Sequence, residues 1–269
     1  MPLPVPFTFS QASLQDHQDC PRRFQLRYIE RLSYPAIESE PTLENERHQQ
    51  EGETFHRLIQ QYLLGIPAEK VSKLANSTNL ERWWMNFLAS FNFDRQTDLL
   101  YPEMTLSAPL AGSRLMAKYD LVTGSPENGF TIYDWKTYRK RPRNEFLVTR
   151  LQTRVYRALL ARAGAHLNSG QPITPERIEM IYWFADFPNE PARFRYDPSQ
   201  DKRDWDSLEK TAKEITAQAS FPPTDETRQC AYCTYRSYCD RGIRAGGGDT
   251  IESELTLDIT LEQVPEIEL

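Results

Sequence analysis

Residues 130–140 read FTIYDWKTYRK, and the first seven have the pattern of a buried β-strand that carries two charges. Successive side chains of a strand point to opposite faces, so Asp134 and Lys136 share one face while Trp135 points to the other. A carboxylate and an ammonium on an apolar strand cost free energy if they are buried without partners. Taken alone, such a D-x-K pair is more often a surface salt bridge on an edge strand. Other residues of the chain must therefore indicate whether the pair has a function.

The preceding segments predict two more strands joined to this one by hairpins. Residues 103–107 and 113–123 are short runs bounded by turn signals, and the turn GSPENG leads into residues 129–135. A hairpin about that turn would bring Asp120 close to Asp134. Two converging carboxylates repel each other unless a cation lies between them, and oxygen ligands suit Mg²⁺ or Mn²⁺. Such a metal activates water, and Lys136 would orient the nucleophile or neutralise charge on a phosphate.

Helical patterns precede and follow these strands. Ser10 is expected to cap an N-terminal helix that is interrupted at Cys20–Pro21. Further helices and one further strand are predicted at residues 44–64 (helix), 80–91 (helix), 146–163 (helix), 177–187 (strand) and 203–219 (helix). Helices, a β-meander, a helix and another strand predict an α/β domain with a mixed central sheet flanked by helices.

The length of 269 residues suits either one large domain or a domain with an appended subdomain. We expect a helical segment at 1–43, a core at 44–200, a helix and a three-cysteine segment at 201–245, and an acidic tail at 246–269. No run of eighteen apolar residues occurs, and the first ten residues make a poor signal peptide, so we expect a cytoplasmic protein without a membrane span. In the cytoplasm, clustered cysteines favour metal binding or redox chemistry over disulfides.

Charge is unevenly distributed along the chain. The net charge is −6, but residues 249–269 hold seven acidic residues and no Lys or Arg. Without them 32 basic residues face 31 acidic ones, a net charge of +1. One short run has eight basic residues against one acid: Lys136, Arg139, Lys140, Arg141, Arg143, Arg150, Arg154 and Arg157 against Glu145. This run predicts a phosphate-backbone binder, although a solvated helix face is the plainer alternative. Residues 254–261 of the tail alternate as a strand does.

An ordered set of motifs between residues 50 and 157 resembles the RecB-like branch of the PD-(D/E)XK nucleases. It consists of the G-x-x-x-H of GETFH ending at His56, Glu103 on the first strand, Asp120, the D-x-K of Asp134 and Lys136, and the Q-x-x-x-Y of Gln152 and Tyr156. One position departs from the pattern, because Ala117 stands where the family usually has Gly.

The resemblance implies a restriction-endonuclease-like fold and a role for each matched residue. It implies that His56, Asp120 and Asp134 bind the metal, and that Asp120, Asp134 and Lys136 form the catalytic group. Glu103 would contact the metal ligands without binding the metal itself. Gln152 and Tyr156 would contact DNA. Independently of the resemblance, the basic run adds Arg139, Lys140 and Arg154 as expected DNA-binding residues.

The cysteines extend the resemblance. Three of the four lie in CAYCTYRSYC at residues 230–239, whereas Cys20 stands more than two hundred residues upstream. The AddB-type and CRISPR-associated adaptation nucleases carry one cysteine before the nuclease core and three after it. The similarity implies a [4Fe–4S] cluster on Cys20, Cys230, Cys233 and Cys239 that joins the two ends of the fold. Structural Zn²⁺ on the same four thiolates is the alternative.

The expected function is metal-dependent, exonuclease-like hydrolysis of DNA, at single strands or ends, in repair or CRISPR adaptation. The sequence has no G-x-x-x-x-G-K-[ST], so any unwinding would come from a partner such as a helicase or an adaptation-complex protein. A non-catalytic DNA-binding or assembly subunit is a second hypothesis, against which the intact Asp120, Asp134 and Lys136 argue. A zinc-stabilised RNA-binding module is a third, disfavoured by the lack of aromatic-rich RNA motifs.

Overall fold

A computed structural model describes residues 3–32, 42–93 and 99–241, which divide into two compact units. The first, here called the core unit, comprises Gln50–Ala108 and Met116–Asp206. The second, the terminal unit, comprises the described parts of Met1–Gln49, Pro109–Leu115 and Ser207–Leu269. The acidic tail and its alternating segment lie outside the described residues. Within the described ranges, no helix combines the length and the apolar character needed to cross a membrane.

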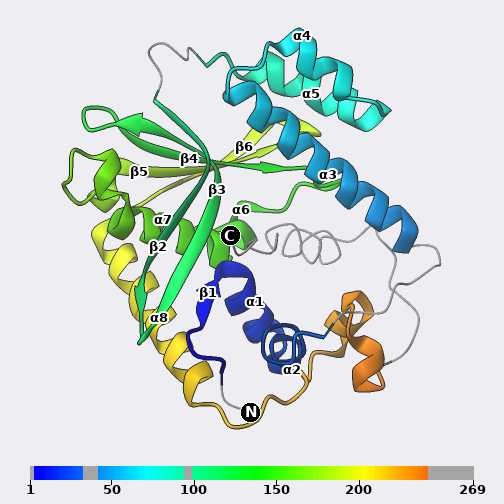
Figure 1. The fold of residues 1–269 in the computed structure, drawn as a ribbon, viewed down its shortest axis with the longest axis vertical. Helices are drawn as coiled ribbons and strands as arrows, with labels where there is room; N and C mark the ends of the chain where they lie inside the picture. Colours follow the sequence, from blue (N-terminus) through cyan, green and yellow to red (C-terminus); the bar gives the residue numbers. More distant parts are fainter. Residues whose placement is uncertain (1–2, 33–41, 94–98, 242–269) are drawn as a thin grey trace. The chain divides into compact units, whose positions relative to one another are not determined.

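The core unit is built on a mixed β-sheet, as the sequence predicts (Figure 1). Its strands are β2 (Leu100–Leu110), β3 (Ser113–Ser125), β4 (Gly129–Lys136), β5 (Ile178–Phe184) and β6 (Phe187–Arg195). The order is β3-β4-β5-β6, and β2 also pairs with β3. β4 runs parallel to β5, whereas the β3–β4 and β5–β6 pairs are antiparallel.

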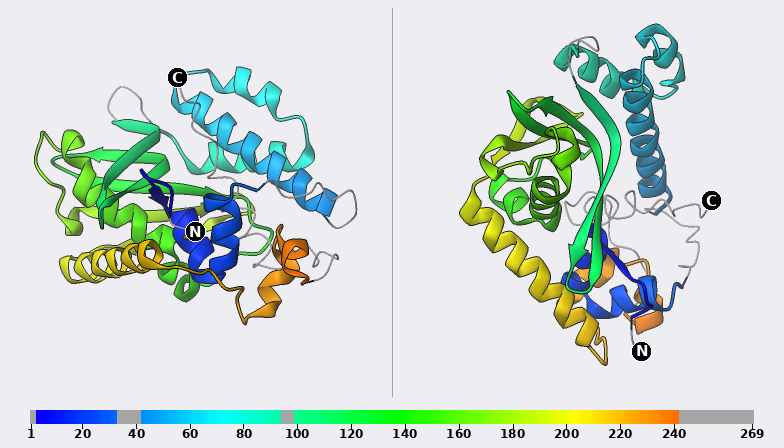
Figure 2. Two further views of the ribbon diagram at one scale, coloured as in Figure 1. Left: turned by 60° about the horizontal axis from the view of Figure 1, so that its bottom comes forward. Right: turned by 60° about the vertical axis from the view of Figure 1, so that its left-hand side comes forward.

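Helices cover both faces of this sheet. α3 (Thr42–Leu63) and α5 (Thr78–Ser90) lie on one face, and α7 (Leu151–Ala163) lies on the other (Figure 2). Trp135 and its register partner Trp183 point to the first face, where they join a buried cluster with Phe55 and Phe87. Alternation along β4 then turns Asp134 toward α7. The polar site and the aromatic core are thus on opposite sides of the same strand.

The terminal unit brings the two ends of the described chain together. It contains β1 (Thr8–Ser10), α1 (Gln11–Asp19), α2 (Pro21–Phe24), the π-helical turn Gln25–Ile29, the end of α8 (Pro198–Ala217), and the 3-10 turns Thr227–Tyr232 and Arg236–Cys239. Ser10 caps α1 and Pro21 starts α2, which confirms both predictions. The rings of Phe24 and Phe221 stack at 5.8 Å, and the hydroxyl of Tyr235 donates to the carbonyl of Leu32 over 3.0 Å.

The single helix predicted at residues 146–163 is wrong. It is two helices, α6 (Asn144–Thr149) and α7, separated at Arg150, whose backbone is extended with ψ 142°. The hydroxyl of Thr153 donates to the carbonyl of Leu147 over 2.6 Å, which satisfies a group that the break would leave unpaired. No Pro or Gly marks this break in the sequence.

Two further boundaries differ from the prediction. The strand expected at 177–187 ends at Phe184, and the chain turns back as β6, which carries Pro188 and Pro191. Prolines are tolerated there because β6 ends the strand order and needs only one hydrogen-bonded neighbour. α8 also starts at Pro198, five residues before the predicted helix, and a short helix, α4 (Ala68–Val71), was not predicted.

Candidate active site

Two charged side chains of β4 form a buried ion pair. Nζ of Lys136 lies 2.8 Å from Oδ2 of Asp134, and the two residues are only 3% and 2% exposed. Their predicted position on one strand face is confirmed. Gln152, at the start of α7, donates from Nε2 to the other oxygen of Asp134 over 2.7 Å. Gln152 in turn accepts from the hydroxyl of Tyr182 over 3.4 Å. The carboxylate is thus held by an ammonium and an amide.

Asp120 is held beside this pair by the backbone of β4. It lies on β3, one position before the register pair Leu121↔Tyr133. The N–H of Trp135 donates to Oδ2 of Asp120 over 2.7 Å, and Nδ1 of His56 on α3 lies 3.3 Å from Oδ1. The hairpin that the sequence predicts therefore does bring Asp120 to the strand that carries Asp134.

The surroundings of His56 and Asp120 favour their charged forms. Burial lowers the pKa of His56, but the Asp120 carboxylate outweighs it and raises that pKa to about 9. Burial acts to raise the pKa of Asp120, yet the charges of His56 and Lys136 and the N–H of Trp135 hold it below the ordinary value. Each carboxylate of the site therefore has a cation of the chain beside it.

Glu103 occupies a strained backbone position on β2. Its φ is 54°, in the left-handed region that costs a non-glycine residue about 1–3 kcal/mol. Its carboxylate lies 2.5 Å from Nζ of Lys118. Burial and the charge of Asp120 raise the pKa of Glu103, while Lys118 opposes them. Strain that turns a carboxylate toward Asp120 is typical of a functional position.

Tyr156 and Gln152 are buried in this structure, with 2% and 6% exposure. The resemblance implied that both contact DNA. Here the hydroxyl of Tyr156 donates to the carbonyl of Lys118 over 2.9 Å, and the hydroxyl of Tyr119 donates to the carbonyl of Tyr156 over 2.9 Å. These bonds tie α7 to β3, and Gln152 ties α7 to Asp134. The observed contacts of the Q-x-x-x-Y pair position the carboxylates.

The basic run is largely engaged within the core unit. Arg154 donates to Asp204 over 2.9 Å, and Arg157 is fully buried and donates to the carbonyl of Arg195 over 2.8 Å. Arg141 donates to the carbonyl of Glu190 over 2.7 Å. Two residues of the run that were expected to bind DNA reach the surface: Arg139 in part and Lys140 fully.

The described residues contain no group of three or more His, Cys, Asp or Glu side chains arranged as a preformed metal site. The donors at the carboxylate pair nevertheless fit a divalent cation. Asp120 and Asp134 offer carboxylate oxygens from adjacent strands, and His56 offers a ring nitrogen to the same place. Hard divalent cations prefer such oxygen donors. Lys136 and His56 balance the same charge that a metal would balance.

The four cysteines line one cavity of about 20 Å³ in the terminal unit, and none forms a disulfide. Burial raises the pKa of the Cys233 and Cys239 thiols. Four sulfur donors around one cavity suit either Zn²⁺ or an iron–sulfur cluster.

Arginines surround the cysteine cavity, which the sequence analysis did not foresee. Arg23 and Arg236 both line it and are 6% and 5% exposed. Asp16 holds Arg23 through a 2.7 Å ion pair, and Arg236 donates to the carbonyl of Cys233 over 3.1 Å. The charge of Arg23 lowers the pKa of the Cys233 thiol, but burial outweighs it, so these guanidinium groups offset only part of the cost of a buried thiolate.

Comparison with known proteins identifies the family. The family description of the PD-(D/E)XK nuclease superfamily matches residues 8–240, and the chain therefore belongs to this superfamily. Among solved structures, the protein SSO0001 is 13% identical with a TM-score of 0.40, covering 88% of this chain and 87% of that one. A protein of Eubacterium rectale named "Putative exonuclease" is 8% identical with a TM-score of 0.49, covering 81% of this chain and 84% of that one. No curated protein sequence matches this chain.

The sequence analysis missed the groups that hold the carboxylates in place. The backbone N–H of Trp135 and the hydroxyl of Tyr182 have no motif of their own. Strand alternation offered one usable signal, because Tyr182 and Asp134 are register partners on neighbouring parallel strands. The register itself could not be read from the sequence, since the two strands are separated by more than forty residues.

Proposed function

We propose that this protein is a metal-dependent nuclease that hydrolyses DNA phosphodiester bonds, on single strands or at DNA ends. Membership of the PD-(D/E)XK nuclease superfamily supports nuclease activity. The observation that carries the proposal is the convergence of Asp120, Asp134 and Lys136 on two paired strands, with the carboxylates fixed by Trp135 N–H and Gln152.

We assign the metal to His56, Asp120 and Asp134. When bound, Mg²⁺ or Mn²⁺ supplies a Lewis acid that activates water and stabilises charge on the phosphate. Lys136 lies beside Asp134, where its ammonium orients the attacking water or donates to a phosphate oxygen. Gln152 fixes the orientation of Asp134, so the nucleophile and the phosphate meet prearranged groups. Arg139 and Lys140 provide cationic contacts for the DNA backbone.

The direct test uses end-labelled single-stranded and duplex DNA with the purified full chain. Cleavage is expected with added Mg²⁺ or Mn²⁺ and is expected to stop in EDTA. Circular single-stranded DNA separates the two modes, because an enzyme that needs ends leaves it intact. A chain that cuts neither substrate with either metal contradicts the proposal and leaves a DNA-binding subunit as the remaining hypothesis.

His56→Ala is expected to raise the Mg²⁺ or Mn²⁺ concentration needed for half-maximal cleavage by about tenfold or more. The reason is the loss of one donor 3.3 Å from Asp120. His166→Ala, which removes a histidine of the same unit that lies outside the site, is the matched control and should titrate as the unmodified chain does. An unchanged metal titration of the His56 variant assigns this residue a structural role only.

We also propose that Cys20, Cys230, Cys233 and Cys239 hold a metal centre that joins the two ends of the described chain. The resemblance favours [4Fe–4S], and structural Zn²⁺ on the same four thiolates is the alternative. Both rest on the four sulfur donors and the buried arginines around them. Elemental analysis of the anaerobically purified chain distinguishes about four irons from one zinc per chain.

Truncation after Gly248 is expected to strengthen binding to single-stranded DNA, most at low salt. The seven acidic residues removed compete electrostatically with DNA for the basic residues of the run, and ions screen that competition. The affinity for DNA is measured at two salt concentrations. The full-length and truncated chains should have different affinities at about 50 mM salt and similar affinities at about 300 mM salt. A full-length control with all seven acids changed to Asn or Gln should match the truncated chain. Equal affinities at low salt reject the inhibitory role.

A further inference from the structure

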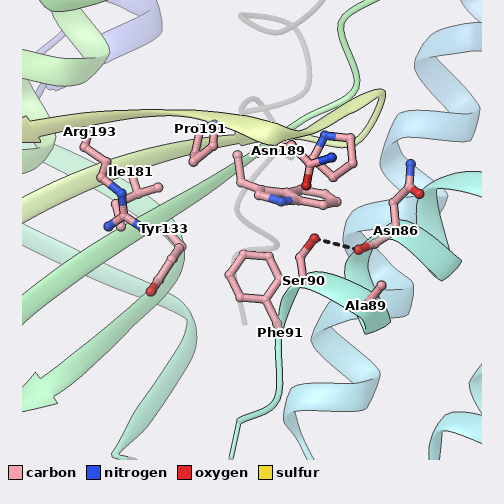
Figure 3. A pocket seen from close by; sticks show the side chains of 11 residues that line it. Asn86, Ala89, Ser90, Phe91, Tyr133, Ile181, Asn189, Pro191 and Arg193 are labelled. Atoms are coloured by element: carbon pink, nitrogen blue, oxygen red, sulfur yellow. Dashed lines mark hydrogen bonds between the residues drawn. The ribbon is translucent and has the colours of Figure 1, made fainter.

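A second pocket lies in the core unit, on the face of the sheet opposite Asp134 and Lys136. Its volume is about 530 Å³. Its walls come from the end of α5, from β4 and β5, and from β6 (Figure 3). Tyr133 on β4 and Trp183 on β5 line it, and alternation separates both from the carboxylate side. The proposed nuclease chemistry makes no use of this pocket, whose size is that of a small-ligand site.

Aromatic rings form much of its lining. The ring of Phe91 lies 5.5 Å from that of Tyr133 and 5.5 Å from that of Trp183, measured between centroids. Phe91 and Tyr133 are only partly buried, so their rings are accessible to a ligand. Partly exposed aromatic rings around a pocket favour a flat, conjugated guest that can stack on them.

Trp183 contributes its ring, and not its indole nitrogen, to the pocket. The residue is 2% exposed and lines the wall. Its Nε1 has almost no accessible surface, so this atom does not face the pocket. Trp183 therefore backs the aromatic wall on which a flat guest would stack.

The remaining lining mixes apolar residues with a few polar side chains, which include two amides and one arginine. Asn86 donates from Nδ2 to the carbonyl of Ala185 over 2.8 Å, which fixes its amide at the wall. Asn189 is an exposed amide, and Arg193 is paired with Glu179 at 3.3 Å. Amides match the donor and acceptor edge of a nucleobase. The pairing of Arg193 leaves the wall without the strong positive charge that a site for a bare phosphate would need.

We propose that this pocket binds one unstacked nucleobase, at a site separate from the carboxylate pair. The base would stack on Phe91 or Tyr133 and present its edge to Asn86 and Asn189. The inference rests on the proposed function in one respect only, namely where the base comes from. If the protein is a nuclease, the base would belong to the nucleic-acid strand or to the mononucleotide product. Recognition of the base itself depends on the pocket alone.

The test titrates dAMP and dTMP into the full chain in EDTA, so that cleavage and metal binding play no part. Saturation transfer to the base protons in NMR reports contact, and calorimetry gives the Kd. Ala89→Phe fills the pocket from the exposed end of α5. Met85→Phe, at a position 63% exposed on the same helix and outside the pocket lining, is the matched control. We expect Ala89→Phe to weaken binding by about tenfold or more and Met85→Phe to leave it unchanged.

Three outcomes overturn the proposal: no saturable binding, equal binding by the Ala89→Phe variant, or competition by deoxyribose 5-phosphate as strong as that by dAMP. The last result would mean that sugar and phosphate are recognised rather than the base. A chain that cuts no DNA but binds dAMP in a way that Ala89→Phe disrupts supports the pocket and rejects the nuclease proposal. Cleavage of DNA without nucleotide binding supports the nuclease proposal and rejects the pocket.

Discussion

Asp134→Asn is expected to reduce metal-dependent DNA cleavage by about 10³-fold or more, with DNA binding largely retained. The change keeps the shape of the side chain and an oxygen for Gln152 but removes the charge that would bind the metal. It also leaves the buried Lys136 ammonium without its counter-ion, so the Tm is measured together with the rate. The readout is the single-turnover rate at saturating Mg²⁺, with affinity for uncleaved DNA measured separately in Ca²⁺ or EDTA. A drop in rate without a drop in affinity is the signature of a group that acts at the reacting phosphate.

Lys136 needs a more careful variant because it is buried. Removing its ammonium alone leaves the buried Asp134 carboxylate without its counter-ion, which costs about 3–5 kcal/mol and confuses unfolding with lost chemistry. The double variant Asp134→Asn with Lys136→Met removes both charges together and should keep the Tm near that of the unmodified chain. Asp186→Asn, which breaks the surface pair with Arg82, is the control and should cut DNA normally. Activity retained in Asp134→Asn and in the double variant would sink the assignment of the site.

Cys20→Ala and Cys233→Ala are expected to lose the bound metal and to lower the Tm by similar amounts, about 10 °C or more. The two residues are far apart in sequence but line the same cavity, so each variant removes one ligand of the same centre. Metal content and visible absorbance report the centre, and thermal unfolding reports the stability.

Ser237→Ala serves as the control, because Ser237 is exposed in the same 3-10 turn that ends at Cys239. It should keep both the metal and the Tm. If Cys20→Ala leaves both unchanged while Cys233→Ala does not, the four-ligand centre is wrong and the three local cysteines act without Cys20. The packing of Phe24 on Phe221 and the hydrogen bond from Tyr235 to Leu32 would then hold the two ends together.

Local patterns predicted the strands of the site well, and they failed where tertiary context outweighs them. The period-two alternation of 129–136 placed Asp134 and Lys136 on one face, and the turn at 124–129 placed Asp120 beside them, as observed. The break at Arg150 has no local signal. Arg150 is neither Pro nor Gly and residues that favour helices flank it, yet its backbone is extended. β6 was missed because its local signal is misleading. Its prolines argue against a strand, and they are tolerated only because β6 ends the strand order.

The sequence by itself determined most of the elements, their order and the identity of the chemical groups, because hydrophobic periodicity, caps and turns act over a few residues. Only the tertiary structure decided how those groups are held: Trp135 N–H on Asp120, Gln152 on Asp134, and the strained backbone of Glu103. It also decided that Tyr156 is buried and that arginines surround the cysteines. These contacts join residues far apart in the chain, and their geometry depends on strand register and helix packing, which no local pattern encodes.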